Sequence, residues 1–294
     1  MQKILAFLQL VRVNNLIILL ATLVFSYYFL TDYLTIEDLF QPRFILLCLC
    51  IILTSAAGYI INDYYDINID LTNKPEKVII GKHISRRKAM FIHFIFSVVA
   101  FIIGLYLSWY LGSIIFFTTI VLWLYSVYFK KRLLSGNIIV AALSAFVLLV
   151  LPFFNPLISK YLVWIYSVFS FGVSLIRELV KDTEDLRGDS KFNCKTLPIL
   201  FGVRKTKKVL IALNLVFIGL LLTHLFIANS YIPFRHQANA IVYIFYILLF
   251  LVFPLLIAMY YIYRADVKSD FSRLSLFYKI YMLIGIFSMV IIKL

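Results

Sequence analysis

Residues 44–70 read FILLCLCIILTSAAGYIINDYYDINID, an apolar run that ends in a cluster of acidic and amide side chains. The apolar part is close to the ~20 residues that an α-helix needs to cross the hydrocarbon core of a bilayer. No charged residue interrupts it before Asp63. The stretch therefore predicts a transmembrane helix over residues 43–64, with carboxylates at one of its ends.

The rest of the chain has the same apolar character. Of its 294 residues, 63% are hydrophobic and 14% are charged, and the mean hydropathy is +0.98, whereas soluble proteins average roughly 45–50% apolar and 25% charged residues. This composition excludes a soluble enzyme and predicts a single all-α integral membrane domain over residues 1–294. We expect nine transmembrane segments, at about 9–30, 43–64, 86–108, 111–129, 137–156, 160–181, 206–228, 238–263 and 273–292.

The basic residues are distributed unevenly between the two sides that this count defines. The formal net charge is +14, and 24 of the 28 lysines and arginines fall at the N-terminus or around the loops after the even-numbered segments. Cytoplasmic loops of membrane proteins carry an excess of Lys and Arg. We therefore expect a cytoplasmic N-terminus and a multi-pass protein of the cell (inner) membrane, and we attribute the positive charge to topology rather than to nucleic-acid binding.

Most of the acidic residues lie in two short windows on the predicted cytoplasmic side. The spacing Asp-x-x-Asp-x-x-x-Asp occurs in both, at Asp63, Asp66 and Asp70 and again at Asp182, Asp185 and Asp189. Clustered carboxylates near membrane depth repel one another and are costly to dehydrate. Ordinary interfacial charges that pair with lysines are one explanation, but the duplicated spacing favours a cation site, and it also suggests an internal repeat.

Helical geometry predicts how these side chains are presented. Asn62, Asp66 and Asp70 fall on one stripe of a helix, because each step of four residues turns by only about 40°. Glu178, Asp182, Asp185 and Asp189 are expected on a second stripe. Hard oxygen ligands suit Mg²⁺, which binds through few carboxylates together with substrate phosphates. The nearby lysines suit a diphosphate.

The two windows carry a resemblance to a known family. The segment NDYYDINID at 62–70 resembles the NDxxDxxxD signature of the intramembrane UbiA-type prenyltransferases, and the segment NKPEKVI at 73–79 resembles that family's NRPxRPI loop, with Lys74 and Lys77 in place of both arginines and Val78 in place of the second proline. The segment RELVKDTEDLRGD at 177–189 resembles the REIxKDxEDxxGD form, which is most like the digeranylgeranylglyceryl phosphate synthase branch.

The resemblance implies a ring of nine helices around a central cavity. It also implies Mg²⁺-dependent transfer of a prenyl group from its diphosphate to a lipid acceptor, and in this branch we expect the prenyl group to be geranylgeranyl. In that branch the acceptor is the hydroxyl of a prenylglyceryl phosphate. We expect metal ligands at Asn62, Asp66, Asp70, Asp182, Asp185 and Asp189, with Asp66, Asp70, Asp182 and Asp185 as the catalytic carboxylates. We expect substrate-binding roles for Arg12, Asn15, Lys74, Lys77, Tyr125, Lys130 and Lys195. Asp63 or Glu178 could act as the general base.

Three other functions compete with this interpretation. Prenylation of an aromatic quinone precursor would use the same motifs. A cation-coupled transporter would bind its ion near the membrane midplane on broken helices, whereas these acids lie at helix ends beside basic loops. A CDP-alcohol phosphotransferase would carry an Asp-Gly dipeptide, and the chain contains none.

Overall fold

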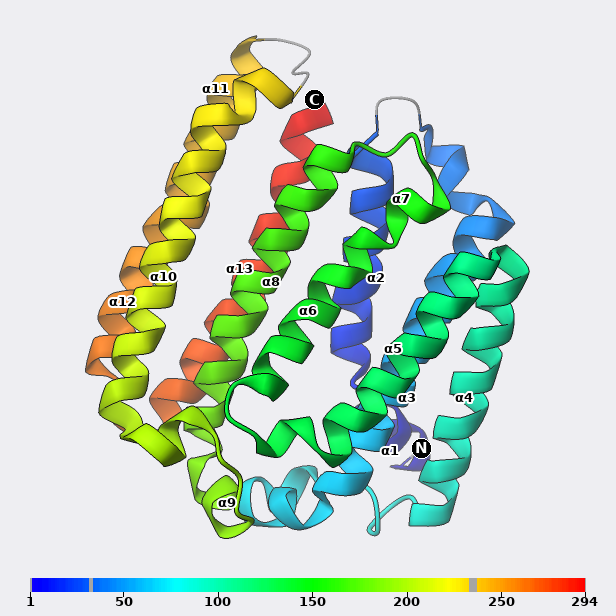
Figure 1. Ribbon diagram of the computed structural model, residues 1–294, viewed down its shortest axis with the longest axis vertical. Coiled ribbons are helices and arrows are strands. Elements are labelled where there is room, and N and C mark those ends of the chain that lie inside the picture. Colours follow the sequence, from blue (N-terminus) through cyan, green and yellow to red (C-terminus); the bar gives the residue numbers. More distant parts are fainter. Residues whose placement is uncertain (1, 32–33, 233–236, 294) are drawn as a thin grey trace. The chain divides into compact units, whose positions relative to one another are not determined.

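The computed structural model describes residues 2–31, 34–232 and 237–293, and it assigns helices but no β-strand to them. The chain divides into two compact units, which are described separately. The first comprises Met1–Val24, Thr35–Gly136 and Arg187–Cys194, and the second comprises Phe25–Leu34, Asn137–Leu186 and Lys195–Leu294. The helices are α1 (Gln2–Leu10), α2 (Val13–Phe29), η1 (Ile36–Phe40), α3 (Pro42–Asn73), η2 (Pro75–Lys77), α4 (Arg86–Leu107), α5 (Trp109–Val127), η3 (Phe129–Lys131), α6 (Ser135–Leu149), α7 (Leu151–Phe154), α8 (Lys160–Glu184), α9 (Leu186–Lys191), α10 (Leu197–Tyr231), α11 (Gln237–Tyr246), η4 (Ile247–Val252), α12 (Phe253–Arg264) and α13 (Lys268–Lys293) (Figure 1).

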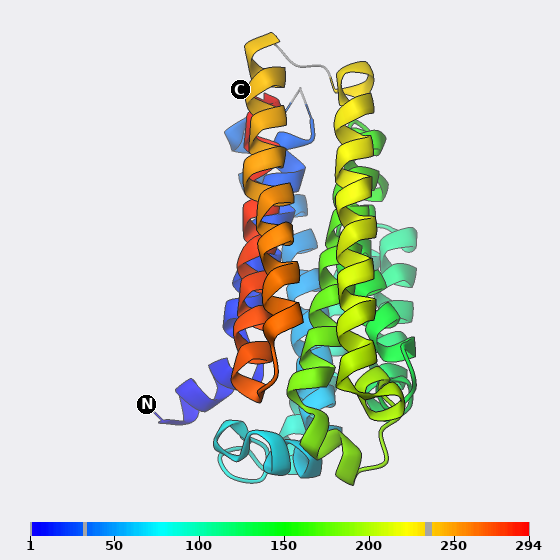
Figure 2. The ribbon, with the colours of Figure 1, turned by 90° about the vertical axis from the view of Figure 1, so that its left-hand side faces the viewer.

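The apolar segments form long helices, as the sequence predicts. In the described residues, eight helices are long and apolar enough to cross a membrane. A ninth span is counted only if the bent pair Lys3–Leu10 and Val13–Phe29, which meet at 51°, is taken as one crossing. Figure 2 shows α1 turning away from α2 at this bend. Arg12 lies at the break with a φ of +52°. The predicted segment 9–30 therefore corresponds to α2, with the last two residues of α1 and the bend before it.

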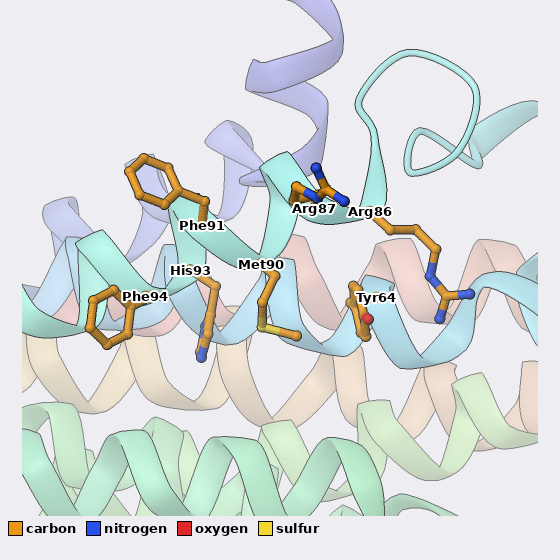
Figure 3. A pocket seen from close by; sticks show the side chains of 7 residues that line it. All are labelled: Tyr64, Arg86, Arg87, Met90, Phe91, His93 and Phe94. Atoms are coloured by element: carbon orange, nitrogen blue, oxygen red, sulfur yellow. The ribbon is translucent and has the colours of Figure 1, made fainter.

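In the first unit, α3, α4 and α5 pack against one another. Small residues allow this close approach, as is usual between membrane helices. A Cβ on Gly58 of α3 would lie 2.9 Å from the Leu122 side chain of α5, and a Cβ on Gly104 of α4 would lie 3.1 Å from Gly112 of α5. At the start of α4, the Arg86 guanidinium lies over the ring of Tyr64 from α3, 4.8 Å from its centroid (Figure 3).

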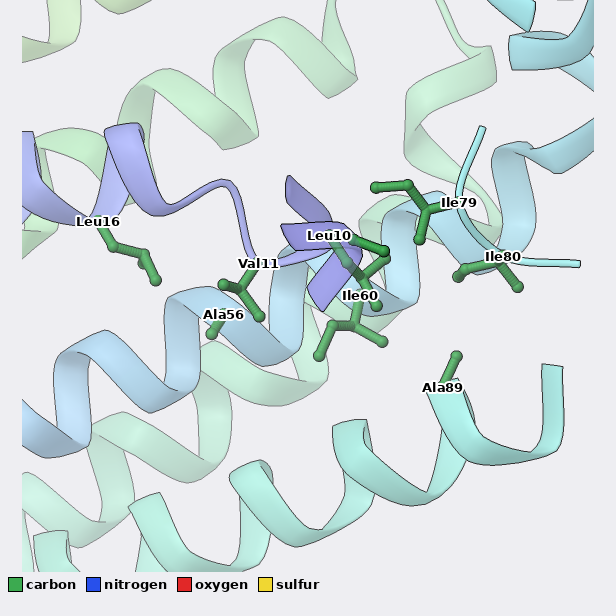
Figure 4. Close-up of a cluster of buried hydrophobic side chains, with 9 residues drawn as sticks. Leu10, Val11, Leu16, Ala56, Ile60, Ile79, Ile80 and Ala89 are labelled. Carbon is green, nitrogen blue, oxygen red and sulfur yellow. The ribbon is translucent and has the colours of Figure 1, made fainter. Parts of the chain in front are cut away.

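A buried apolar cluster joins the start of the chain to the loop that follows α3. Leu10, Val11 and Leu16 pack with residues of α3, with Ile79 and Ile80 of the loop, and with Ala89 of α4 (Figure 4). Burying such side chains contributes roughly 1.5–3 kcal/mol for each large one. The cluster therefore fixes the bend at Arg12 and the loop after α3 to the end of the helix that carries the first acidic motif.

In the second unit, α8 packs against α13 and α10. Gly285 of α13 makes room for the ring of Phe169, and Gly172 of α8 makes room for Phe217. Two pairs of buried polar groups here are hydrogen-bonded: Tyr166 and Ser288 share a 2.8 Å hydrogen bond, and the Tyr278 hydroxyl donates to Asn214 at 2.9 Å. Such pairing is required where no water is present to satisfy polar groups.

Candidate active site

The first acidic motif lies near the C-terminal end of α3. Because α3 is continuous from Pro42 to Asn73, Asn62, Asp66 and Asp70 share one helix, as predicted. Asp66 is only 2% exposed, while Asn62 and Asp70 are half-buried. The helix ends at Asn73, since Lys74 has non-helical backbone angles, with φ −149° and ψ 65°, and the Pro75 that follows disfavours the helical conformation at Lys74.

Lys130 is the charged partner of Asp66. Its ammonium forms a short ion pair with the Asp66 carboxylate, and it is placed there by η3, which follows directly after α5. Gly136 keeps this segment compact, since a Cβ on it would lie 3.0 Å from the Lys130 backbone. Burial of the ammonium disfavours its charge, but Asp66, Tyr125 and Asp70 outweigh that effect and raise the pKa of Lys130. Lys130 is therefore a fixed cation at the first motif.

Arg12 is the charged partner of Asp63. Its Nη2 donates to Asp63 Oδ1 at 2.7 Å, and its guanidinium lies over the ring of Tyr59 at 5.0 Å from the centroid. The left-handed backbone at Arg12 lets its carbonyl accept from Asn15 N at 2.7 Å and so begin α2. An arginine at membrane depth is expected to be paired or functional. Here it ties the bend between α1 and α2 to the side of the first motif.

The loop after α3 carries the predicted basic residues Lys74 and Lys77. Lys74 caps the helix, with its N–H donating to the Asp70 carbonyl at 2.8 Å. The backbone of Lys77 ends η2, whereas its side chain lies outside the described part of the structure. The loop then turns at Gly81, whose φ is +90°, and Ile79 and Ile80 anchor it in the apolar cluster. Lys74 is thus held one helical turn from Asp70.

The second acidic motif does not form a single helical stripe, and that prediction is wrong. α8 ends at Glu184, Asp185 is its C-cap, and Asp189 belongs to the separate helix α9. Asp182 and Asp185 belong to the second unit, and Asp189 to the first. The stripe was inferred from helical periodicity, which assumes an unbroken helix and does not detect the cap at Asp185.

Within the second unit, Asp182 accepts a 2.8 Å hydrogen bond from Asn137 Nδ2 at the start of α6. Asp185 N donates to the Lys181 carbonyl at 2.8 Å and ends the helix. Glu178, one turn before Asp182, accepts from Lys181 at 3.0 Å and lies 3.3 Å from Arg177 Nη1. Asn137 therefore orients a predicted ligand carboxylate, while Glu178 is held by two cations.

Asp189 is buried in the first unit, and its position depends on the residue before it. Gly188 N donates to Asn73 Oδ1 at 2.8 Å, and a Cβ on Gly188 would lie only 2.4 Å from the Asn73 side chain. Asp189 itself is 7% exposed, and its carbonyl accepts from Cys194 N at 3.1 Å. The end of α3 and the end of the second motif are therefore connected by the contact between Asn73 and Gly188.

The remaining predicted residues lie in different surroundings. Asn15 begins α2 through its hydrogen bond to the Arg12 carbonyl. Tyr125 lies on α5 next to Gly136 and contributes to the field at Lys130. Lys195 is exposed and lies in the second unit. Asn73 is the first residue of the segment 73–79 but has no predicted role of its own, and Asn137 lies outside both motifs; their contacts with Gly188 and Asp182 identify them.

A magnesium site can be tested against the donor atoms of the first motif. Among the described residues, no three acidic, histidine or cysteine side chains are close enough to hold a metal ion. Asn62 Oδ1 is nevertheless buried and has no hydrogen-bond partner in the described structure, which is unfavourable for an amide oxygen unless something binds it. Asp66 and Asp70 interact electrostatically on the same helix. These oxygen donors are of the type that Mg²⁺ prefers.

Comparison with known proteins places the chain within one family. The model of the UbiA prenyltransferase family matches residues 18–283. Relatives named digeranylgeranylglyceryl phosphate synthase include that of Methanosphaera stadtmanae, which is 34% identical over 60% of this chain and 64% of its own length. The protein of that name from Saccharolobus solfataricus is 31% identical over 85% of each chain, and that of Sulfurisphaera tokodaii is 29% identical over 95% of this chain and 94% of its own.

Solved structures agree with this placement. A structure that concerns a digeranylgeranylglyceryl phosphate synthase superposes with a TM-score of 0.72 at 26% identity and covers 100% of both chains. A UbiA homologue from Archaeoglobus fulgidus, bound to GPP and Mg²⁺, superposes with a TM-score of 0.64 at 17% identity over 97% of this chain and 99% of its own. At that identity the second comparison shows a shared fold.

Proposed function

The chain belongs to the UbiA prenyltransferase family, and from this premise we propose that it transfers a prenyl group from a prenyl diphosphate to a lipid acceptor in a Mg²⁺-dependent reaction. We further propose that the donor is geranylgeranyl diphosphate and that the acceptor is the hydroxyl of a prenylglyceryl phosphate. The relatives named digeranylgeranylglyceryl phosphate synthase support this choice.

The observation that carries the proposal is the part-buried ion pair between Asp66 and Lys130. Asp66 lies one helical turn from Asp70 near the C-terminal end of α3. Burying charged groups in this way is costly unless they are paired. Two carboxylates and one ammonium leave one negative charge in excess, which a bound cation would offset, and that cation together with Lys130 could then hold an anionic ligand. The UbiA homologue bound to GPP and Mg²⁺ supports the proposal that these two ligands are Mg²⁺ and a prenyl diphosphate.

We propose that Mg²⁺ binds to the oxygen donors of the first motif, Asn62, Asp66 and Asp70. The buried Asn62 Oδ1, which has no hydrogen-bond partner in the described structure, supports this assignment. When bound, Mg²⁺ would neutralise the negative charge that develops on the departing diphosphate. Asp182, Asp185 and Asp189 are proposed as further oxygen ligands on the strength of the motif that contains them.

Several residues of this chain would bind and orient the substrate diphosphate. Lys130 and Lys74 carry ammonium groups that suit phosphate oxygens as point charges. Lys130 would exchange its contact with Asp66 for one with the diphosphate. Arg12 is already paired with Asp63 and stacked on Tyr59, so it would position the wall of the site rather than supply a free charge.

The reaction exchanges one C–O bond for another. The bond between the allylic carbon and the diphosphate breaks, and the diphosphate leaves with the bonding electrons. The glycerol oxygen forms a bond to the allylic carbon and loses its proton. Asp63, Glu178 and Glu184 are the carboxylates of the two motifs outside the proposed ligand set. Asp63 and Glu178 are each held by a cation. We propose that the proton passes to Asp63, to Glu178 or to water.

We propose that the site faces the cytoplasm. The excess of basic residues on the side of the bilayer where both acidic motifs are expected supports this orientation, because cytoplasmic loops are rich in Lys and Arg. Labelling of single cysteines introduced near residues 76 and 190 should place both on the same side as the N-terminus. Labelling from opposite sides would contradict the topology, and with it the proposed site.

The function is tested directly with membranes that contain the protein, labelled geranylgeranyl diphosphate, and either geranylgeranylglyceryl phosphate or an aromatic acid as acceptor. We expect the label to enter the glycerol lipid and the reaction to stop when EDTA removes the metal. Transfer to the aromatic acid alone would show that the acceptor is wrong while leaving the prenyltransferase assignment intact. Transfer to neither acceptor would contradict the proposed reaction.

A further inference from the structure

A second site lies on the outer surface of the first unit, where α4 begins beside α3. A groove of about 680 Å³ runs along the first two turns of α4, and its lining includes Tyr64, Arg86, Arg87, Met90, Phe91 and Phe94 (Figure 3). Its polar end is formed by the two arginines. Its walls are formed by apolar and aromatic side chains together with His93, whose Nδ1 lies 3.0 Å from the Ala57 carbonyl oxygen. None of the residues proposed to hold the metal or the diphosphate lines it.

The arginines of the groove are not explained by the stability of α4. The positive end of a helix dipole lies at its N-terminus, where basic side chains are unfavourable and acidic ones favourable. The first turn of α4 nevertheless carries Arg86, Arg87 and Lys88 and no acidic residue. In the described structure, neither Arg86 nor Arg87 forms an ion pair with a carboxylate. An anion bound at this end of the helix would relieve the repulsion.

Two aromatic side chains in the apolar walls of the groove are largely exposed. Phe91 is 65% exposed and Phe94 is 60% exposed, and both lie on α4, one of the helices long and apolar enough to cross a membrane. At 1.5 Å of rise per residue, Phe94 lies about 12 Å along the helix from Arg86. The groove thus changes from cationic to apolar over the distance that separates a lipid headgroup from the upper part of its chains.

The contact between Arg86 and Tyr64 pre-organises the polar end of the groove. The Arg86 guanidinium is held over the ring of Tyr64, 4.8 Å from the centroid, so its direction is fixed by contact with the neighbouring helix. A stacked arginine retains its hydrogen-bond donors for a phosphate. Arg86 is therefore held at the polar end of the groove by a contact with the neighbouring helix.

We propose that this groove binds one molecule of an anionic membrane lipid, with its phosphate between Arg86 and Arg87 and a hydrocarbon chain along Phe91 and Phe94. Charge complementarity, the adjacent apolar walls and the position of the groove at the end of a membrane-spanning helix select this occupant. The proposal concerns a resident lipid of the bilayer and is independent of the proposed reaction, since it involves a different set of residues.

The test is native mass spectrometry of the full-length protein in detergent, titrated with phosphatidylglycerol or phosphatidylcholine. We expect the wild-type protein to retain one phosphatidylglycerol more strongly than phosphatidylcholine. The double substitution Arg86→Gln and Arg87→Gln should weaken phosphatidylglycerol binding about 30-fold, which corresponds to ~1 kcal/mol for each basic residue near an anionic lipid. Equal retention of both lipids by the wild type would overturn the proposal.

A matched control removes the same charge elsewhere. Arg204→Gln with Lys205→Gln alters the early part of α10, where Lys205 lies over the ring of Phe201 at 5.9 Å from its centroid, and should leave phosphatidylglycerol binding unchanged. An equal loss in both double variants would show a diffuse charge effect and no defined site. Circular dichroism of each variant verifies its fold.

A second variant tests the apolar walls without changing the charge. Phe91→Ala with Phe94→Ala removes two exposed rings, so it should leave the core intact while weakening the binding of long-chain phosphatidylglycerol more than that of its short-chain analogue. An equal effect on both chain lengths would contradict the proposed placement of the hydrocarbon chain. Preferential displacement of the bound lipid by a prenylglyceryl phosphate would show that the groove serves the acceptor, and this would overturn the assignment to a resident lipid.

Discussion

Replacing Lys130 with methionine removes the cation that compensates Asp66 while keeping an unbranched side chain of similar length. The Asp66 side chain is 4% exposed and that of Lys130 is 28% exposed. Breaking a buried ion pair by removing one partner costs about 3–5 kcal/mol, and the partial exposure of Lys130 reduces this through solvent screening. We therefore expect the metal-free Lys130→Met protein to be about 2–3 kcal/mol less stable than the wild type.

Magnesium should reverse much of this loss. A ligand that binds only the folded state at 100 times its Kd stabilises it by about 2.7 kcal/mol. In the wild type, the cation must compete with Lys130 for Asp66, whereas in the variant it meets an uncompensated carboxylate. The stabilisation by Mg²⁺ should consequently be larger in Lys130→Met than in the wild type, although turnover falls because the diphosphate loses a partner.

The assay is thermal unfolding in detergent, followed by circular dichroism with and without Mg²⁺. The matched control is Lys131→Met, which changes the exposed neighbouring residue of η3 and should behave as the wild type in both conditions. The two variants could instead have equal metal-free stability and equal shifts in unfolding temperature on adding Mg²⁺. That result would refute the reasoning that Lys130 compensates a metal-binding carboxylate.

Three further outcomes follow from contacts around the motifs. Gly188→Ala should destabilise the wild type by about 1–2 kcal/mol, because it displaces Asn73 and leaves a buried N–H unpaired. In an Asn73→Ala background the same change should be neutral or stabilising, because only the helix preference of alanine remains. Thermal unfolding of both pairs of proteins checks this reversal. Burial and the nearby carboxylates raise the pKa of Cys194 to about 11, so its thiolate is scarce at neutral pH. The alkylation rate of Cys194, measured by mass spectrometry, should keep rising as the pH passes the usual thiol pKa of about 8.5. An alkylation rate that levels off near pH 8.5 would be inconsistent with that environment. Arg12→Gln and Asp63→Asn should lower thermal stability by less in combination than the sum of the single losses; strict additivity would show that their ion pair contributes nothing.

The apolar segments could be predicted from the sequence because hydropathy over about 20 residues is a local property. The continuous helix that carries Asn62, Asp66 and Asp70 is of this kind, since periodicity alone places them together and Pro75 marks the end of that helix. The bend at Arg12 was not predicted, because the left-handed φ of that residue is stabilised by packing of Leu10, Val11 and Leu16 against distant residues.

The helix break and the tertiary contacts of the second motif could not be predicted from the sequence. Its spacing repeats that of the first motif, and periodicity predicts one stripe, but α8 ends at Glu184 and Asp189 lies in another helix. The contact between Gly188 and Asn73 joins residues 115 positions apart, and the hydrogen bond between Asn137 and Asp182 joins residues 45 positions apart. Such tertiary contacts leave no periodic signal in a single sequence.

The most direct test of the central claim is the Mg²⁺ dependence of prenyl transfer by Asp66→Asn. This change keeps the size of the side chain and removes the negative charge that pairs with Lys130 and that we propose to bind the cation. We expect turnover with geranylgeranyl diphosphate to fall at least about 100-fold at saturating Mg²⁺, a loss typical of removing one electrostatic contribution to a transition state. Asp266→Asn, an exposed carboxylate outside both motifs, should retain wild-type turnover. If Asp66→Asn is folded and keeps wild-type turnover with unchanged Mg²⁺ dependence, Asp66 is not a metal ligand and the proposed active site is wrong.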